Sequence, residues 1–67
     1  MVTDKDVWRV AKHVIEEHGA AAPTVAAEYA KGFRAAGKDG AHKAWTRIGK
    51  AVREMQRATP HHGEAVN

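Results

Sequence analysis

The sequence predicts an all-α fold, a compact three-helix bundle with short loops. Three apolar runs have the i, i+3, i+4 spacing of amphipathic helices, within residues 4–18, 25–36 and 41–58. Glycine and proline punctuate the chain between the runs. The strict alternation of apolar and polar residues that favours strands is absent. Because short connections favour antiparallel neighbours, we expect an up-down-up domain over residues 1–60 and a frayed tail over 61–67.

The first helix is expected over residues 4–18. Thr3 or Asp4 can cap its N-terminus, and Gly19 is a natural C-terminal stop. Its apolar face holds Val7, Trp8, Ala11, Val14, Ile15 and His18. Residues 20–24 then form a linker that leads into the second run.

The second and third helices are separated by the connection at residues 38–40. Pro23 suits the first turn of the second helix, and Gly37 ends that helix. Gly32 inside it should cost about 1 kcal/mol relative to alanine unless it permits a close helix contact. Asp39 is the expected N-cap of the third helix, which continues to about Ala58.

The core of this chain is expected to be small. The 67 residues contain no cysteine and no leucine, and alanine supplies much of the hydrophobic fraction of 43%. A domain of this size gains only about 3–5 kcal/mol from one core, so self-association is the remaining route to stability and we expect a homodimer. The expected large anchors are Trp8, Tyr29, Phe33 and Trp45, with Val7, Val14, Ile15, Ile48, Val52 and Met55. Trp45 is expected as a core or dimer-interface anchor, and Trp8, on the flank of its helix, is the candidate for the dimer interface.

No constellation in the sequence has the spacing of a catalytic or metal site. Serine and cysteine are absent, and Glu16 and Glu17 point about 100° apart on a helix. His13, His18 and His42 form no histidine pair on one helix face, and adjacent His61 and His62 with Glu64 could hold a metal only weakly. We therefore expect a protein that is not an enzyme and has no cofactor and no resident metal.

The strongest candidate for a working surface is a basic stripe on the third helix. The net charge is +3, and the excess lies in residues 22–38 (+2) and 39–58 (+3). We define the basic stripe as Lys43, Arg47 and Lys50, near Arg57 on the same face. Glu54 can pair with Lys50 or Arg57, whereas Lys43 and Arg47 have no acidic partner at helical spacing.

Two kinds of partner suit this stripe, and an ordinary solvated helix face remains the alternative to both. The first is an acidic protein surface, which would make the chain a non-catalytic protein-interaction or adaptor module. The second is nucleic acid bound by the basic face of the third helix. A helix-turn-helix interpretation fails because Thr46 and Gly49 stand where that motif needs apolar residues. DNA binding would therefore depend on charge alone.

The chain also resembles a known group of proteins. The His18-Gly19 helix end, Gly37 and Gly40, and then Ala44-Trp45-x-x-Ile48-x-x-Ala51-Val52 are similar to small bacterial all-helical proteins grouped as a domain of unknown function. The resemblance spans most of residues 7–60 and implies a helical protein encoded alone, with no binding residues to carry over.

The first residues and the hydropathy of the chain indicate where in the cell the protein is expected. Charges at Asp4, Lys5 and Asp6 stand where a signal peptide needs an apolar run. No segment approaches the ~18 consecutive apolar residues of a membrane span. We expect a cytoplasmic protein without a membrane segment.

Overall fold

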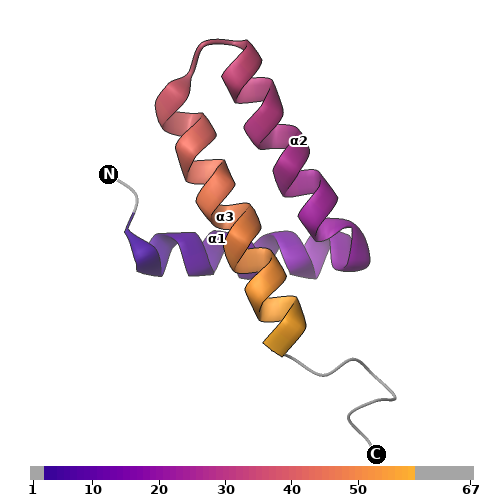
Figure 1. Cartoon of the computed structure of the whole chain (residues 1–67). Coiled ribbons are helices and arrows are strands. Elements are labelled where there is room, and N and C mark those ends of the chain that lie inside the picture. The colour runs from indigo at the N-terminus through magenta and orange to yellow at the C-terminus, as the bar shows by residue number, and fades with distance from the viewer. Residues whose placement is uncertain (1–2, 59–67) are drawn as a thin grey trace, which may run out of the picture.

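The computed structural model describes residues 3–58 and confirms the all-α class (Figure 1). The elements are α1 (Asp4–His18), the short 3-10 helix η1 (Gly19–Ala21), α2 (Ala22–Ala35) and α3 (Asp39–Ala58). Residues 3–58 contain no strand. None of the helices in this range is both long and apolar enough to cross a membrane. The tail predicted over residues 61–67 lies outside the described residues.

The predicted up-down-up bundle is not confirmed. Helical residues run without a break from Asp4 to Ala35, so the expected linker at residues 20–24 is itself helical. Figure 1 shows α2 and α3 as an antiparallel hairpin and α1 lying across it. The alanines of this segment favour helix, and Pro23 stands in the first turn of α2, where its missing N–H costs nothing. Gly19, at φ 55°, redirects the chain between the two helices.

The start of α1 follows the prediction. Thr3 is the N-cap, and its hydroxyl oxygen accepts a hydrogen bond of 3.2 Å from the Asp6 N–H. The Asp6 carboxylate in turn accepts a 3.5 Å bond from the Thr3 N–H, which completes a capping box. Asp4 and Asp6 both lie in the first turn, where the helix dipole favours negative charge.

The end of α2 is a Schellman motif centred on Gly37. The Gly37 N–H donates to the Arg34 carbonyl at 3.0 Å, and the Lys38 N–H donates to the Phe33 carbonyl at 2.9 Å. Gly37 has a φ of 78°, which L residues rarely adopt. The prediction that Gly37 ends the second helix is therefore confirmed.

The prediction that Asp39 caps α3 is wrong. Asp39 is already the first helical residue, because the His42 N–H donates to the Lys38 carbonyl at 2.9 Å. The Asp39 carboxylate instead lies in the first turn of α3, where the positive end of the helix dipole favours it.

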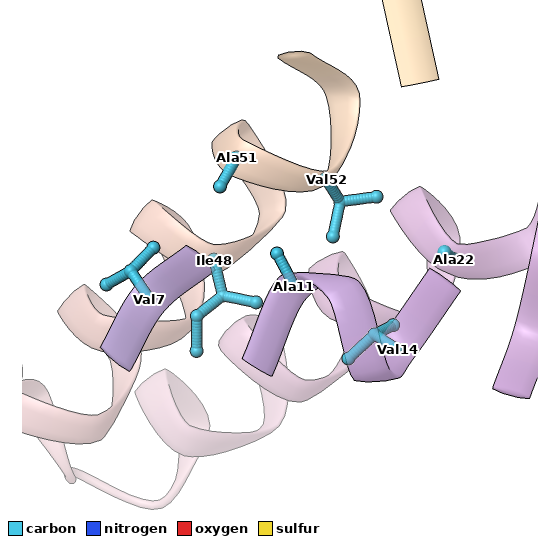
Figure 2. Packing of buried hydrophobic residues seen from close by; sticks show 7 residues of the cluster. All are labelled: Val7, Ala11, Val14, Ala22, Ile48, Ala51 and Val52. Carbon is cyan, nitrogen blue, oxygen red and sulfur yellow. The ribbon is translucent and has the colours of Figure 1, made fainter. Parts of the chain in front are cut away.

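The core consists of small and medium aliphatic side chains. Figure 2 shows residues of α1 and α3 facing one another, with Ala22 of α2 beside them. Nine hydrophobic residues of the described part of the chain are buried, and five of them are alanine. They are Val7, Ala11, Val14, Ala22, Ala26, Ala30, Ile48, Ala51 and Val52.

The large aromatic anchors predicted for this core are not buried. Trp8 is 45% exposed and Tyr29 is 50% exposed, while Phe33 and Trp45 are only partly buried. Trp45 still packs against the core cluster, as do Ile15 and Met55. The reason is that a periodic apolar face shows which side of a helix avoids water, but not how much of that side a neighbouring helix covers.

The close contact between α2 and α3 lies at Gly49 rather than at Gly32. A Cβ added at Gly49 would lie 3.4 Å from the Ala26 Cβ, whereas one added at Gly32 would meet no atom within 4 Å. Gly49 is buried and Gly32 is exposed. The pair Gly49 and Ala26 therefore sets the close approach of the two helices.

Candidate functional site

The structure brings Trp8 next to two residues of the basic stripe. They line one groove of about 340 Å³ between α1 and α3, which we call the Trp8 groove. Its lining consists of Asp4, Val7, Trp8, Arg47, Lys50, Ala51 and Glu54. Val7 and Ala51 are buried, so they form its floor. Trp8 follows Val7 by about 100° around the helix, and its indole therefore stands at the flank of the buried face.

Charges of both signs surround this groove. Arg47 of α3 forms an ion pair with Asp4 of α1, a contact between helices that spacing along α3 alone could not reveal. Glu54 pairs with Arg57 at 3.1 Å rather than with Lys50. Lys50 forms no ion pair within residues 3–58. Both pairs are well exposed, so each contributes about 0–1 kcal/mol to stability.

Lys43 is the stripe residue that the structure leaves outside the groove. Its side chain is exposed, and it belongs to none of the three grooves described here. The basic stripe is therefore divided, with Arg47 and Lys50 beside Trp8 and Lys43 on open surface.

A second groove, of about 380 Å³, is largely apolar. The rings of Tyr29 and Trp45 meet here, with centroids 4.7 Å apart and planes tilted by 36°. We call this groove the aromatic groove. Its lining consists of Val10, His13, Val14, Glu17, His18, Val25, Tyr29, Phe33 and Trp45. His13 and Glu17 approach to 3.3 Å at its edge. His18, predicted on the apolar side of its helix, is exposed in the last turn of α1.

A third groove, of about 270 Å³, runs between α2 and α3 and is strongly basic. We call it the cationic groove; its lining consists of Ala27, Ala30, Lys31, Arg34, His42, Trp45, Thr46, Gly49 and Arg53. Three of these residues are cationic and none is acidic. Sequence reasoning located the basic excess in these two helices but missed this set, because the set depends on the register between the helices.

Two of the three histidines within residues 3–58, His13 and His42, make side-chain contacts with other residues. The Nδ1 atom of His42 lies 2.8 Å from the Ala30 carbonyl oxygen, so the imidazole donates a hydrogen bond from α3 to α2. Within residues 3–58, no group of three His, Cys, Asp or Glu side chains could hold a metal ion. His61 and His62 lie outside the described residues.

Comparisons with protein-family models, with curated proteins and with solved structures found no match for the chain.

Proposed function

We propose that the protein is a non-catalytic three-helix interaction module that forms a homodimer through its Trp8 groove. The observation that carries this proposal is a tryptophan, 45% exposed, in a groove that also holds Arg47 and Lys50. Tryptophan, tyrosine and arginine are enriched among the residues that dominate binding energy at protein interfaces, and the Trp8 groove combines two of these three residue types.

The size of the core supports self-association. Val52 is the largest side chain that is fully buried, and all four aromatic residues of the chain keep contact with solvent. Aromatic side chains bury about 150–250 Å² each when covered, so they are the largest unused source of hydrophobic stabilisation in this chain. A second copy would supply that cover without a disulfide, which this chain cannot form.

The charges of the Trp8 groove favour a second copy over a strongly acidic partner. Arg47 and Lys50 line the groove together with Asp4 and Glu54, so the surface carries two charges of each sign. A two-fold axis places one surface against itself, so each cation of one copy can meet a carboxylate of the other. An acidic protein would instead meet those same two carboxylates and be repelled by them.

The proposal is tested by the association state of the full-length protein with Trp8→Ala and its matched control Tyr29→Ala. Both variants remove an exposed aromatic ring, but Tyr29 lines the aromatic groove. We expect a dimer for the wild type by sedimentation equilibrium, at least ~30-fold weaker association for Trp8→Ala, and little change for Tyr29→Ala. A monomeric wild type at about 100 μM would refute the dimer, and dissociation by Tyr29→Ala alone would move the interface to the aromatic groove.

Charge reversal tests the electrostatic part of the proposal. Lys50→Glu places a third carboxylate in the Trp8 groove, whereas Lys43→Glu makes the same change on the same helix outside it. We expect Lys50→Glu to weaken the dimer about tenfold and Lys43→Glu to leave it within about twofold. Equal effects would show that net charge, and not the groove, controls association.

A further inference from the structure

We infer that the cationic groove between α2 and α3 binds the phosphodiester backbone of nucleic acid. The residues that carry the inference are Lys31 and Arg34 of α2 and Arg53 of α3. They are not the basic stripe that the sequence singled out, and the groove shares no residue with the Trp8 groove. The inference therefore stands independently of the homodimer.

The cationic groove carries positive charge that no ion pair within residues 3–58 offsets. All three cationic side chains are exposed, and none forms an ion pair within residues 3–58. Arg47 and Arg57, by contrast, each contact a carboxylate. With no acidic residue in its lining, the cationic groove combines uncompensated positive charge with a concave shape, which focuses the field on an anion.

The floor of the cationic groove is made of very small residues. Gly49, Ala27 and Ala30 present almost no side chain, and the contact of Gly49 with Ala26 holds the two helices close together. Long basic side chains can therefore reach over a shallow floor from both helices.

The spacing of the three cations along the groove favours a chain of phosphates over a single anion. Because α2 and α3 are antiparallel and Ala26 meets Gly49, Arg53 lies about 6 Å along the axis on one side of that contact. Lys31 and Arg34 lie about 7 Å and 12 Å along it on the other side. The three cations thus follow the groove instead of converging on one point, and a lone phosphate could reach only part of the set.

Polar side chains on the groove are held in fixed positions. His42 is tied to the Ala30 carbonyl at 2.8 Å, and the Thr46 hydroxyl donates to the His42 carbonyl at 2.8 Å. The His42 bond joins α3 to α2, and the Thr46 bond holds its hydroxyl against the backbone of α3. The ligand would therefore meet a formed surface rather than a surface that must fold on binding.

The test is fluorescence anisotropy with a labelled 12-nucleotide thymidine single strand at 50–300 mM NaCl. We expect log Kd to change with log salt with a slope of about 2, as three phosphate contacts predict for a single strand. The groove variant carries Lys31→Gln, Arg34→Gln and Arg53→Gln, and the stripe variant carries Lys43→Gln, Arg47→Gln and Lys50→Gln. Both variants are made in the Trp8→Ala background, because Arg47 and Lys50 line the proposed dimer groove and their loss would otherwise also weaken the dimer. In that background both variants lose three positive charges, and the stripe variant additionally loses the ion pair of Arg47 with Asp4.

We expect the groove variant to lose at least tenfold in affinity at 50 mM NaCl and most of its salt dependence, while the stripe variant stays within about threefold. Far-ultraviolet circular dichroism of both variants checks that helicity is retained. Single substitutions of each groove residue extend the test should the triple variant unfold, since each should lower the slope by about 0.7.

Four results would overturn the inference. They are absence of wild-type binding at 50 mM NaCl, equal losses in the two variants, equal binding of a poly-glutamate peptide of the same charge, and displacement of the strand by millimolar inorganic phosphate at constant ionic strength. The third result would indicate an acidic protein ligand, and the fourth a site for a small oxyanion. Retained binding by Trp8→Ala would separate this groove from the dimer.

Discussion

Three glycines provide the sharpest check of the helix register, because the same substitution to alanine should have three different outcomes. Gly32→Ala adds a methyl group in the exposed interior of α2, where it meets no atom within 4 Å. Alanine is more favourable than glycine in a helix by about 0.8–1.0 kcal/mol, and nothing in this structure opposes that gain. For a domain of this size the melting temperature should rise by about 4–8 °C.

The other two glycines should respond differently. Gly37→Ala places an L residue at a φ of 78° in the Schellman motif, which should destabilise the fold by about 1–2 kcal/mol. Gly49→Ala brings a Cβ to 3.4 Å from the Ala26 Cβ, at the edge of ordinary contact, so its gain should be smaller than that of Gly32→Ala. Gly49→Leu cannot fit there and should cost about 1–3 kcal/mol through overpacking.

The assay for this series is urea and thermal unfolding followed by circular dichroism at 222 nm, at one protein concentration. A fixed concentration is needed because the proposed dimerisation would make the melting temperature depend on it. A Gly49→Leu variant as stable as the wild type would refute this register between α2 and α3, since their close contact would then lie elsewhere. A Gly32→Ala variant that loses stability would show that Gly32 has a contact outside this chain.

Two further predictions concern the core and the first cap. Val52→Ala removes the largest fully buried side chain and should lower the free energy of unfolding by about 2 kcal/mol, measured by urea denaturation; no loss would contradict its place in the core. Thr3→Ala removes the capping box of α1 and should cost about 0.5–2 kcal/mol, whereas Thr3→Asp should retain most of the stability. Equal losses in both Thr3 variants would show that the hydroxyl does not act as a cap.

Local features of this fold could be predicted from the sequence because each depends on few neighbouring residues. Thr3 and Gly19 mark the ends of α1, Pro23 stands in the first turn of α2, and Gly37 terminates it, as their backbone preferences require. The prediction of a non-helical linker at residues 20–24 was wrong, because this alanine-rich segment contains no residue that stops a helix after Gly19 has redirected the chain.

The relations between helices could not be predicted, since they depend on how one helix is rotated and shifted against another. The ion pair of Arg47 with Asp4 joins residues 43 positions apart. The same limit applies to Trp8 and Tyr29, which belong to apolar faces that are wider than the neighbours that cover them. The cationic groove was missed for this reason as well, although the charge excess of both helices was visible.

The backbone at Gly19 has a consequence for how copies of this chain can exchange parts. Its φ of 55° and ψ of −125° turn α1 away from the axis of α2 within a run of helical residues from Asp4 to Ala35. Right-handed helical φ and ψ at that residue would join α1 and α2 into one long helix with a kink at Pro23, whose ring cannot be accommodated inside a straight helix. The core residues of α1 could then pack against α3 only of another molecule, which is the geometry of a domain swap. These residues are Val7, Ala11 and Val14, which now pack with Ile48 and Val52 of the same chain. The backbone conformation at Gly19 thus separates a self-contained core from one shared between two chains.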